Sequence, residues 1–364
     1  MATRTRGDVL LVGSLPFDEA SDALRAGGEL LGEHLRGVPD GEVGDRKIWI
    51  GFLPRTVYRD HPGLDLLRAP EGGVQHQPDA KPDVWEASFL FGIRDGVETL
   101  RFDDLGYGRL ALESYREYRR LRDEGVIPDG VRFQVCLPGT GSAVSYFFGR
   151  IEDWPRAHAA YHDAIRREIE MIAAVVPAAE LQVQFDLAME FVDLAAGEGR
   201  GIAHWPGEPL EARIQRHAAY LDELWKGLPD EALLGYHWCY GTWGGWPMKA
   251  MPDLGLCVRM SNEAKRRSGR RLDYVHMPVV RDPDEAFFAP LADLDVGDTD
   301  VYLGLVHHDD GVAGFNRRAE LARRHLPRFG IGAVCGYGRL PAAELPDVLA
   351  LHRDCADALA AARA

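Results

Sequence analysis

Residues Leu233–Gly241 read LLGYHWCYG, an apolar run that ends in His-x-Cys, a tyrosine and a glycine. This pattern is typical of a buried strand, in which residues two apart point to the same side, so His237 and Cys239 are expected on one face at its C-terminal end. An imidazole and a thiolate presented together form half of a zinc site. For an isolated His-x-Cys, a satisfied core histidine beside a small buried cysteine is the commoner explanation. Further ligands must therefore come from elsewhere in the chain.

Seven other stretches have strand patterns and are separated by segments with helical periodicity. They begin near Val9, Leu35, Val131, Leu181, Leu272, Val301 and Ile331. Alternating strands and helices predict a parallel sheet, and eight parallel strands close an α/β barrel. We therefore predict a single TIM-barrel domain over residues 1–364, a (β/α)8 fold with long βα loops. The segment 61–82, rich in proline and glycine, is expected to be a long loop that could cover the barrel mouth.

Composition narrows the class of function. The 364 residues carry 42 Lys and Arg against 57 Asp and Glu, a net charge of -15, which disfavours nucleic acids and anionic membranes as partners. No stretch approaches the roughly 20 apolar residues of a membrane span, and the N-terminus lacks a signal-peptide core. The five scattered cysteines do not resemble a secreted disulfide framework. A cytoplasmic protein acting on a small molecule is expected, and its oligomeric state stays open.

Metal-competent side chains recur at the C-terminal ends of the predicted strands, the face that holds the active site of α/β barrels. They are His237, Cys239, His276, His307 and Cys335. Core packing does not readily explain five such residues on four strand ends, whereas a zinc site with one open position needs three or four of them. We therefore predict a zinc site. Core positions are expected for the other cysteines, Cys136, Cys257 and Cys355.

Short motifs add a resemblance that runs from Val9 to Arg339. In chain order they are Val12-Gly13-Ser14, Asp40-Gly41-Glu42 with Arg46, Phe185-Asp186, His237-Trp238-Cys239-Tyr240, His307 and Cys335-Gly336. They resemble motifs of the catalytic barrel of cobalamin-independent methionine synthase, in the broader group that includes uroporphyrinogen decarboxylase-like barrels. The counterparts there are Ile-Gly-Ser, His-Gly-Glu, Ile-Asp-Glu-Pro, the zinc-binding His-Met-Cys-Tyr, the histidine of Asp-Ile-His-Ser, and Asp-Cys-Gly. Each match is short, and the shared order is the specific part.

The resemblance implies a role for each matched residue. His237, Cys239 and Cys335 correspond to zinc ligands. Ser14, Glu42 and Asp186 correspond to positions that hold an amino-acid thiol, whose ammonium group the two carboxylates receive. His307 corresponds to an acid/base residue near the reacting groups, a task that a nearby carboxylate such as Asp186 could share.

The chain also departs from that family. The family's glutamate ligand falls near Pro278, which has no ligating side chain. His276, on the same strand face, could replace it to give a His2Cys2 site, or the fourth position could be open. Asp186 is followed by Leu187-Ala188 instead of Glu-Pro, and the chain has one barrel where the long form of the enzyme has two.

The chemistry that fits is activation of a thiol by zinc, because zinc deprotonates a coordinated thiol whose pKa is otherwise about 8.5. We expect methyl or alkyl transfer to a thiol, with a homocysteine-like acceptor and a folate or corrinoid methyl donor. One alternative is a metal-free uroporphyrinogen decarboxylase-like lyase, in which Arg46, Arg281 and Arg339 bind the carboxylates of a small substrate. Another is a zinc-containing protein that binds a ligand or docks a methyl carrier without chemistry of its own.

Overall fold

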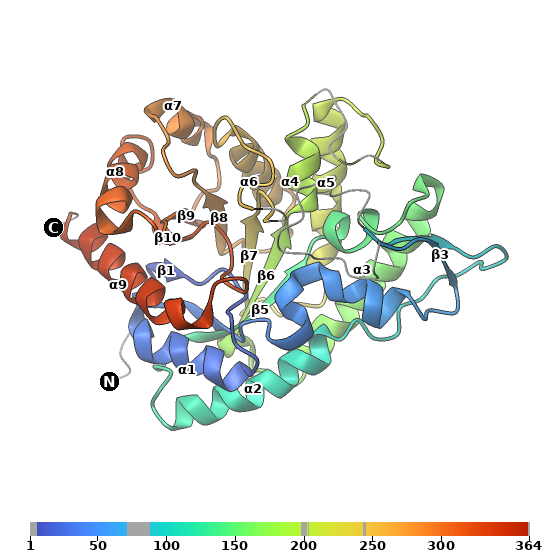
Figure 1. Cartoon of the computed structure of the whole chain (residues 1–364), viewed down its shortest axis with the longest axis horizontal. Helices are drawn as coiled ribbons and strands as arrows, with labels where there is room; N and C mark the ends of the chain where they lie inside the picture. Colours follow the sequence, from blue (N-terminus) through green and yellow to red (C-terminus); the bar gives the residue numbers. More distant parts are fainter. Residues whose placement is uncertain (1–5, 71–87, 198–201, 203, 243–244, 363–364) are drawn as a thin grey trace.

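The eight predicted strands form one parallel sheet in a computed structural model, which describes residues 6–70, 88–197, 202, 204–242 and 245–362 (Figure 1). Its strands are β1 (Val9–Leu10), β2 (Gly37–Pro39), β5 (Arg132–Pro138), β6 (Leu181–Leu187), β7 (Leu233–Trp238), β8 (Tyr274–Pro278), β9 (Asp300–Val306) and β10 (Gly330–Ala333). They are paired in the order β1-β10-β9-β8-β7-β6-β5-β2. A parallel bridge between Val9 and Leu35 brings the two ends of the sheet together. The predicted α/β barrel is confirmed.

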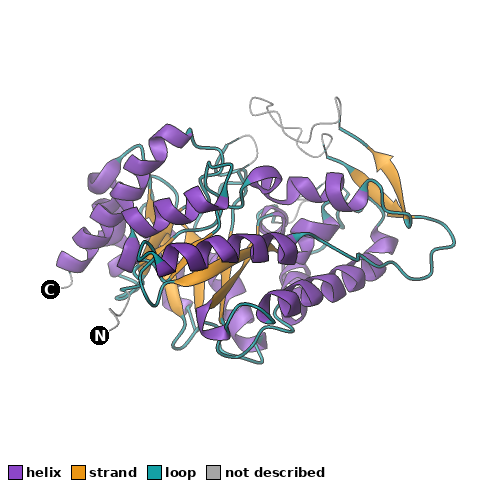
Figure 2. Ribbon diagram, turned by 90° about the horizontal axis from the view of Figure 1, so that it is seen from below, coloured by secondary structure: helices purple, strands orange, loops and turns teal. Residues whose placement is uncertain are grey.

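Helices surround the strands in both ribbon views (Figures 1 and 2). They are α1 (Ala20–Leu30), α2 (Tyr107–Asp123), α3 (Trp154–Ala173), α4 (Met189–Leu194), α5 (Leu210–Leu224), α6 (Gly255–Arg267), α7 (Glu285–Phe288), α8 (Gly311–Arg323) and α9 (Leu345–Ala361). The strands are buried on both faces, as in parallel sheets covered by helices, which explains their nearly continuous apolar runs. Within the described ranges, no helix is both long and apolar enough to cross a membrane.

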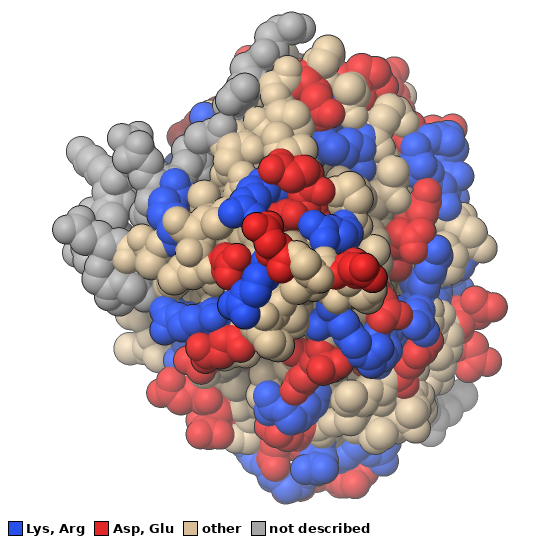
Figure 3. Space-filling view, turned by 90° about the vertical axis from the view of Figure 1, so that its right-hand side faces the viewer, with Lys and Arg blue, Asp and Glu red and all other residues tan. Residues whose placement is uncertain are grey.

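Part of the segment predicted as a loop is a strand. β3 (Leu64–Arg68) pairs antiparallel with β4 (Leu90–Ile93), outside the barrel sheet. The prediction was wrong for these residues because the pairing partner of β3 lies beyond residue 87, and local periodicity does not reveal such a partner. The stretch 71–82 of the expected loop lies outside the described residues. On the face of the molecule that lies to the right in Figure 1, acidic and basic side chains are interspersed (Figure 3).

Candidate functional site

A cavity opens at the C-terminal ends of the barrel strands, where the sequence predicted the site. It encloses about 800 Å3 including its open mouth. Its walls come from the loops after β1, β2 and β10, from the ends of β6 and β7, and from the irregular helical segment Gly44–Phe52. Among the residues that line this cavity are Ser14, Glu42, Lys47, Trp49, Asp186, His237, Cys239, Cys335, Gly336 and Arg339.

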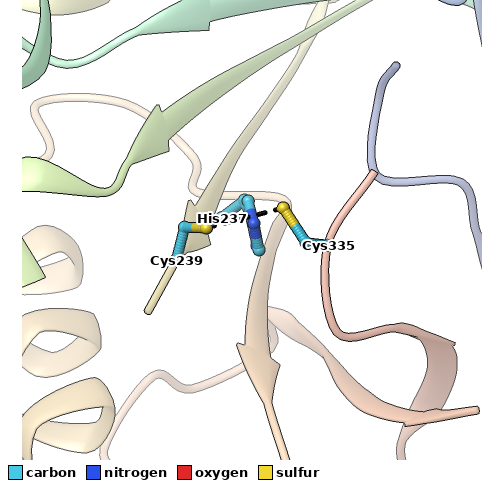
Figure 4. Close-up of side chains that lie close together, drawn as sticks. All are labelled: His237, Cys239 and Cys335. Atoms are coloured by element: carbon cyan, nitrogen blue, oxygen red, sulfur yellow. Dashed lines mark hydrogen bonds between the residues drawn. The ribbon is translucent and has the colours of Figure 1, made fainter. Parts of the chain in front are cut away.

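Three of the predicted ligands lie together in this cavity. His237 and Cys239 come from the end of β7 and Cys335 from the loop after β10, and one donor atom of each lies within 4.8 Å of the others (Figure 4). The sulfur atoms of Cys239 and Cys335 are 3.6 Å apart. Nε2 of His237 is buried and has no hydrogen-bond partner in the described part of the chain. One imidazole nitrogen and two sulfurs are a donor set that suits a zinc site with an open position.

The two cysteines of this cluster have opposite pKa shifts. A hydrogen bond from the thiol of Cys239 holds the pKa of Cys335 well below its usual value, and His237 adds to the effect. The same hydrogen bond, together with burial, raises the pKa of Cys239 well above its usual value. Without a metal these shifts favour a thiolate on Cys335 and a thiol on Cys239.

Glu42, Asp186 and Cys136 form a second group of buried donors within 4.8 Å of one another. Burial raises the pKa of Glu42 to about 8 against the opposing charge of Arg46. Burial and the charge of Glu42 raise the pKa of Asp186 well above its usual value. Two carboxyl groups in this state favour either a shared proton or a bound cation.

Cys136 was predicted as a core residue, and it is buried, but its thiol also borders the site. A methyl group placed on Gly13 would come within 3.3 Å of its sulfur. Cys136 lies near the C-terminal end of β5, just before Leu137 and Pro138. That position was the sequence signal that could have placed the thiol at the active-site face of the barrel.

The loop that carries Glu42 is held by a buried ion pair. Arg46 donates to Asp40 over 2.7 Å, and Asp40 also accepts from the hydroxyl of Ser114 and from the backbone N–H of Glu42. Glu42 has φ 49° and Trp49 has φ 53°, and no other non-glycine residue in the described ranges has a positive φ. Both line the cavity. Backbone strain of this kind persists where the surrounding structure fixes it, often at functional sites.

Ser14 lines the cavity on the loop after β1. Its carbonyl oxygen accepts from the N–H of Tyr337 over 2.6 Å, next to the Cys335 loop. The following residue, Leu15, donates to the carbonyl of Gly41, next to Glu42. The loop after β1 is therefore hydrogen-bonded to both loops that carry site residues, and the substrate-binding role of Ser14 stays a prediction.

His276 does not belong to the donor cluster. Its Nδ1 lies 2.7 Å from Nδ1 of His237, and the residue is fully buried and does not line the cavity. The structure thus brings it against the Nδ1 side of the His237 ring, and its role as a ligand stays a prediction.

His307 is also outside the cavity lining. Its Nε2 donates to the carbonyl of Val279 over 3.0 Å, and its ring packs edge-on against Trp246. Burial lowers the pKa of His307 to about 4, and the charge of Arg318 adds to this. The imidazole is therefore neutral at neutral pH, and its acid/base role stays a prediction.

The arginines required by the metal-free alternative do not converge. Arg46 is paired with Asp40, and Arg281 is paired with Asp309 over 2.5 Å. Arg339 alone of the three lines the cavity, where its guanidinium contacts Thr242. Lys47 also reaches the rim and pairs with Asp18. Sequence reasoning missed Lys47 and Trp49, because the helical segment that carries them has no motif of its own.

Two solved structures are similar to this chain over most of its length. One, from Listeria monocytogenes and assigned as a vitamin-B12-independent methionine synthase, has a TM-score of 0.56 at 14% identity and covers 93% of this chain and 86% of its own. The other, a B12-independent methionine synthase from a Shewanella species in complex with selenomethionine, has a TM-score of 0.60 at 12% identity, with 94% and 88% covered. The chain has the fold of these proteins. The resemblance drawn from the motifs is thus confirmed for the fold, while no family model and no curated protein sequence matches.

Proposed function

We propose that this protein is a zinc-dependent enzyme that transfers a methyl or alkyl group to the sulfur of a small thiol, with a homocysteine-like acceptor. The observation that carries the proposal is the cluster of His237, Cys239 and Cys335, with donor atoms within 4.8 Å in a cavity that also contains Glu42 and Asp186. The shared fold supports it, because both similar structures carry the description of B12-independent methionine synthases.

In this proposal the zinc ion is held by His237, Cys239 and Cys335. When bound, it supplies the acidity that converts the substrate thiol to an oriented nucleophile at neutral pH. Ligand binding requires both cysteines to be deprotonated, so the thiol proton of Cys239 leaves when the site is loaded. The hydrogen bond that Cys239 donates to Cys335 in the metal-free protein is then lost.

Glu42 and Asp186 bind the ammonium group of the acceptor. Their raised pKa values mean that the pair retains a proton at neutral pH when no cation is near. An ammonium group between them would favour the charged carboxylates and release that proton. Recognition of the acceptor is thus coupled to a proton that becomes available inside the cavity.

The proton that Glu42 and Asp186 release can take part in the transfer step. The bond between the methyl carbon and its donor breaks, and a carbon–sulfur bond forms. The leaving nitrogen of a folate donor takes up a proton, whereas the cobalt of a corrinoid donor keeps the electron pair of the broken bond and takes up none. Glu42 and Asp186 give up their proton inside the cavity when the ammonium group binds, so Asp186 can pass it to the donor, whereas His307 would have to move away from Val279. A folate or corrinoid donor is part of the proposal.

The test combines metal analysis with product detection. We expect about one zinc per purified chain, lost in His237→Ala, together with S-methyl product from homocysteine and methyltetrahydrofolate or methylcobalamin. Chelation should stop turnover and added zinc should restore it. A wild-type protein that takes up no zinc, or that turns over equally well with chelator present, would refute the proposal.

A further inference from the structure

His237 and His276 occupy paired positions on neighbouring parallel strands. They are register partners on β7 and β8, so both side chains point into the barrel from the same level. Their rings are tilted by 40° with centroids 4.8 Å apart, and the two Nδ1 atoms lie 2.7 Å from each other. A contact this short between two ring nitrogens needs one proton between them, so one ring donates and the other accepts.

The surroundings of His276 decide which ring donates. Its Nε2 faces the backbone of β10, where a methyl group on Gly332 would lie 3.3 Å away. Burial and the charge of His237 lower the pKa of His276 well below its usual value, so the ring carries a single proton. The backbone of Ala333 opposes that shift as a hydrogen-bond acceptor, although the contact lacks the geometry of a regular hydrogen bond. A proton on Nε2 leaves Nδ1 of His276 as the acceptor. His237 then carries its proton on Nδ1, and its buried Nε2 presents a lone pair.

We propose that His276 is a positioning residue that fixes the tautomer and orientation of His237, so that Nε2 of His237 faces the sulfurs of Cys239 and Cys335. Ligating histidines usually donate their second ring nitrogen to a carboxylate or carbonyl oxygen, and such partners typically change metal affinity by about 10- to 100-fold. Here a second histidine takes that place. The inference rests on the proposed zinc site, and it assigns to His276 a role other than that of a fourth ligand.

Two substitutions separate the roles. His276→Asn places an oxygen acceptor near the position of Nδ1, and His276→Leu has the same branching without an acceptor. A positioning role predicts that His276→Leu raises the Kd for zinc about 10- to 100-fold in a chelator competition, while His276→Asn stays close to wild type. Cobalt-substituted protein should show the same ligand-field bands in wild type and His276→Asn, because the directly bound atoms do not change. Thermal unfolding of both metal-free variants controls for loss of folding.

Three results would overturn the inference. Equal loss of zinc in both variants, with altered cobalt bands, would make His276 a direct ligand. Wild-type affinity in His276→Leu would show that the contact does not matter. If the wild-type protein binds no zinc, the proposed function fails, but imidazole nitrogen NMR of the metal-free protein still tests the histidine pair. We expect protons on Nδ1 of His237 and Nε2 of His276. The reverse tautomers would refute the positioning role.

Discussion

The sulfur atoms of Cys239 and Cys335 lie 3.6 Å apart although 96 residues separate the two cysteines in the sequence. Their hydrogen bond lowers the pKa of Cys335 and raises the pKa of Cys239, which favours the thiolate on Cys335. Cys335 is also the more accessible of the two, because Cys239 is buried. Reactivity toward electrophiles should therefore differ sharply between them.

We expect iodoacetamide to modify Cys335 of the metal-free protein first at neutral pH. An ordinary thiol is only a few per cent ionised there, so a thiolate should react at least about tenfold faster than an accessible unperturbed cysteine. Peptide mass spectrometry over time measures the rates. Cys136, whose thiol is buried and has a raised pKa, is the internal control and should stay unmodified. Faster labelling of Cys239 than of Cys335 would contradict the assignment.

Glu42 should make the metal-free protein less stable as the pH rises. Its pKa is raised from 4.5 to about 8 in the folded state, mainly by burial. Between these values the folded chain holds a proton that the unfolded chain has released, so the free energy of unfolding falls with increasing pH. Glu42→Gln removes this contribution and should gain stability relative to wild type across the same window.

Urea denaturation at about pH 5 and about pH 8 measures the effect. Glu29→Gln serves as the control, because Glu29 lies on α1 with an exposed side chain and pairs with Arg25. Its difference from wild type should change little between the two conditions. A Glu42→Gln variant whose advantage shrinks as the pH rises would show that Glu42 is ionised in the folded protein.

The buried pair of Arg46 and Asp40 should be essential for the shape of the cavity. Arg46→Met would leave the carboxylate of Asp40 buried with Ser114 as its only side-chain partner among the described residues, and breaking one side of a buried pair costs about 3–5 kcal/mol. Loss of the Arg46 charge should also raise the pKa of Glu42 further, since that charge lowers it. Arg25→Met, which removes the exposed pairs of Arg25 with Glu29 and Glu124, should cost less than about 1 kcal/mol. Equal costs for the two variants, measured by denaturation, would contradict this view.

The barrel and the His237–Cys239–Cys335 group could be predicted because both follow from local patterns. Eight apolar runs predict the strands of a parallel sheet, and closure of that sheet into a barrel brings the C-terminal ends of all its strands to one face. The strand β3 was missed because its partner β4 lies far along the chain. The contacts of His276 depend on how its ring is rotated inside the barrel, and strand alternation does not predict that rotation. The strand pattern placed His307 at the barrel mouth, and only the resemblance placed it near the reacting groups. In the structure it is hydrogen-bonded to Val279 and is not among the residues that line the cavity, so that role stays a prediction.

Arg318 holds the turn that carries His307. It is almost completely buried and donates to both carboxylate oxygens of Asp310, over 2.6 and 2.8 Å, and to the carbonyls of Leu305 and Arg281. Arg318→Met removes all four bonds and should lower stability by about 3–5 kcal/mol. Arg324→Met is the matched control on the same side of the barrel, because Arg324 pairs with Glu285 at the surface, and it should cost less than about 1 kcal/mol. Zinc content should be unchanged in both variants, since neither arginine contacts the donor cluster. A loss of zinc in Arg318→Met, at a temperature where the chain stays folded, would mean that the turn after β9 shapes the metal site.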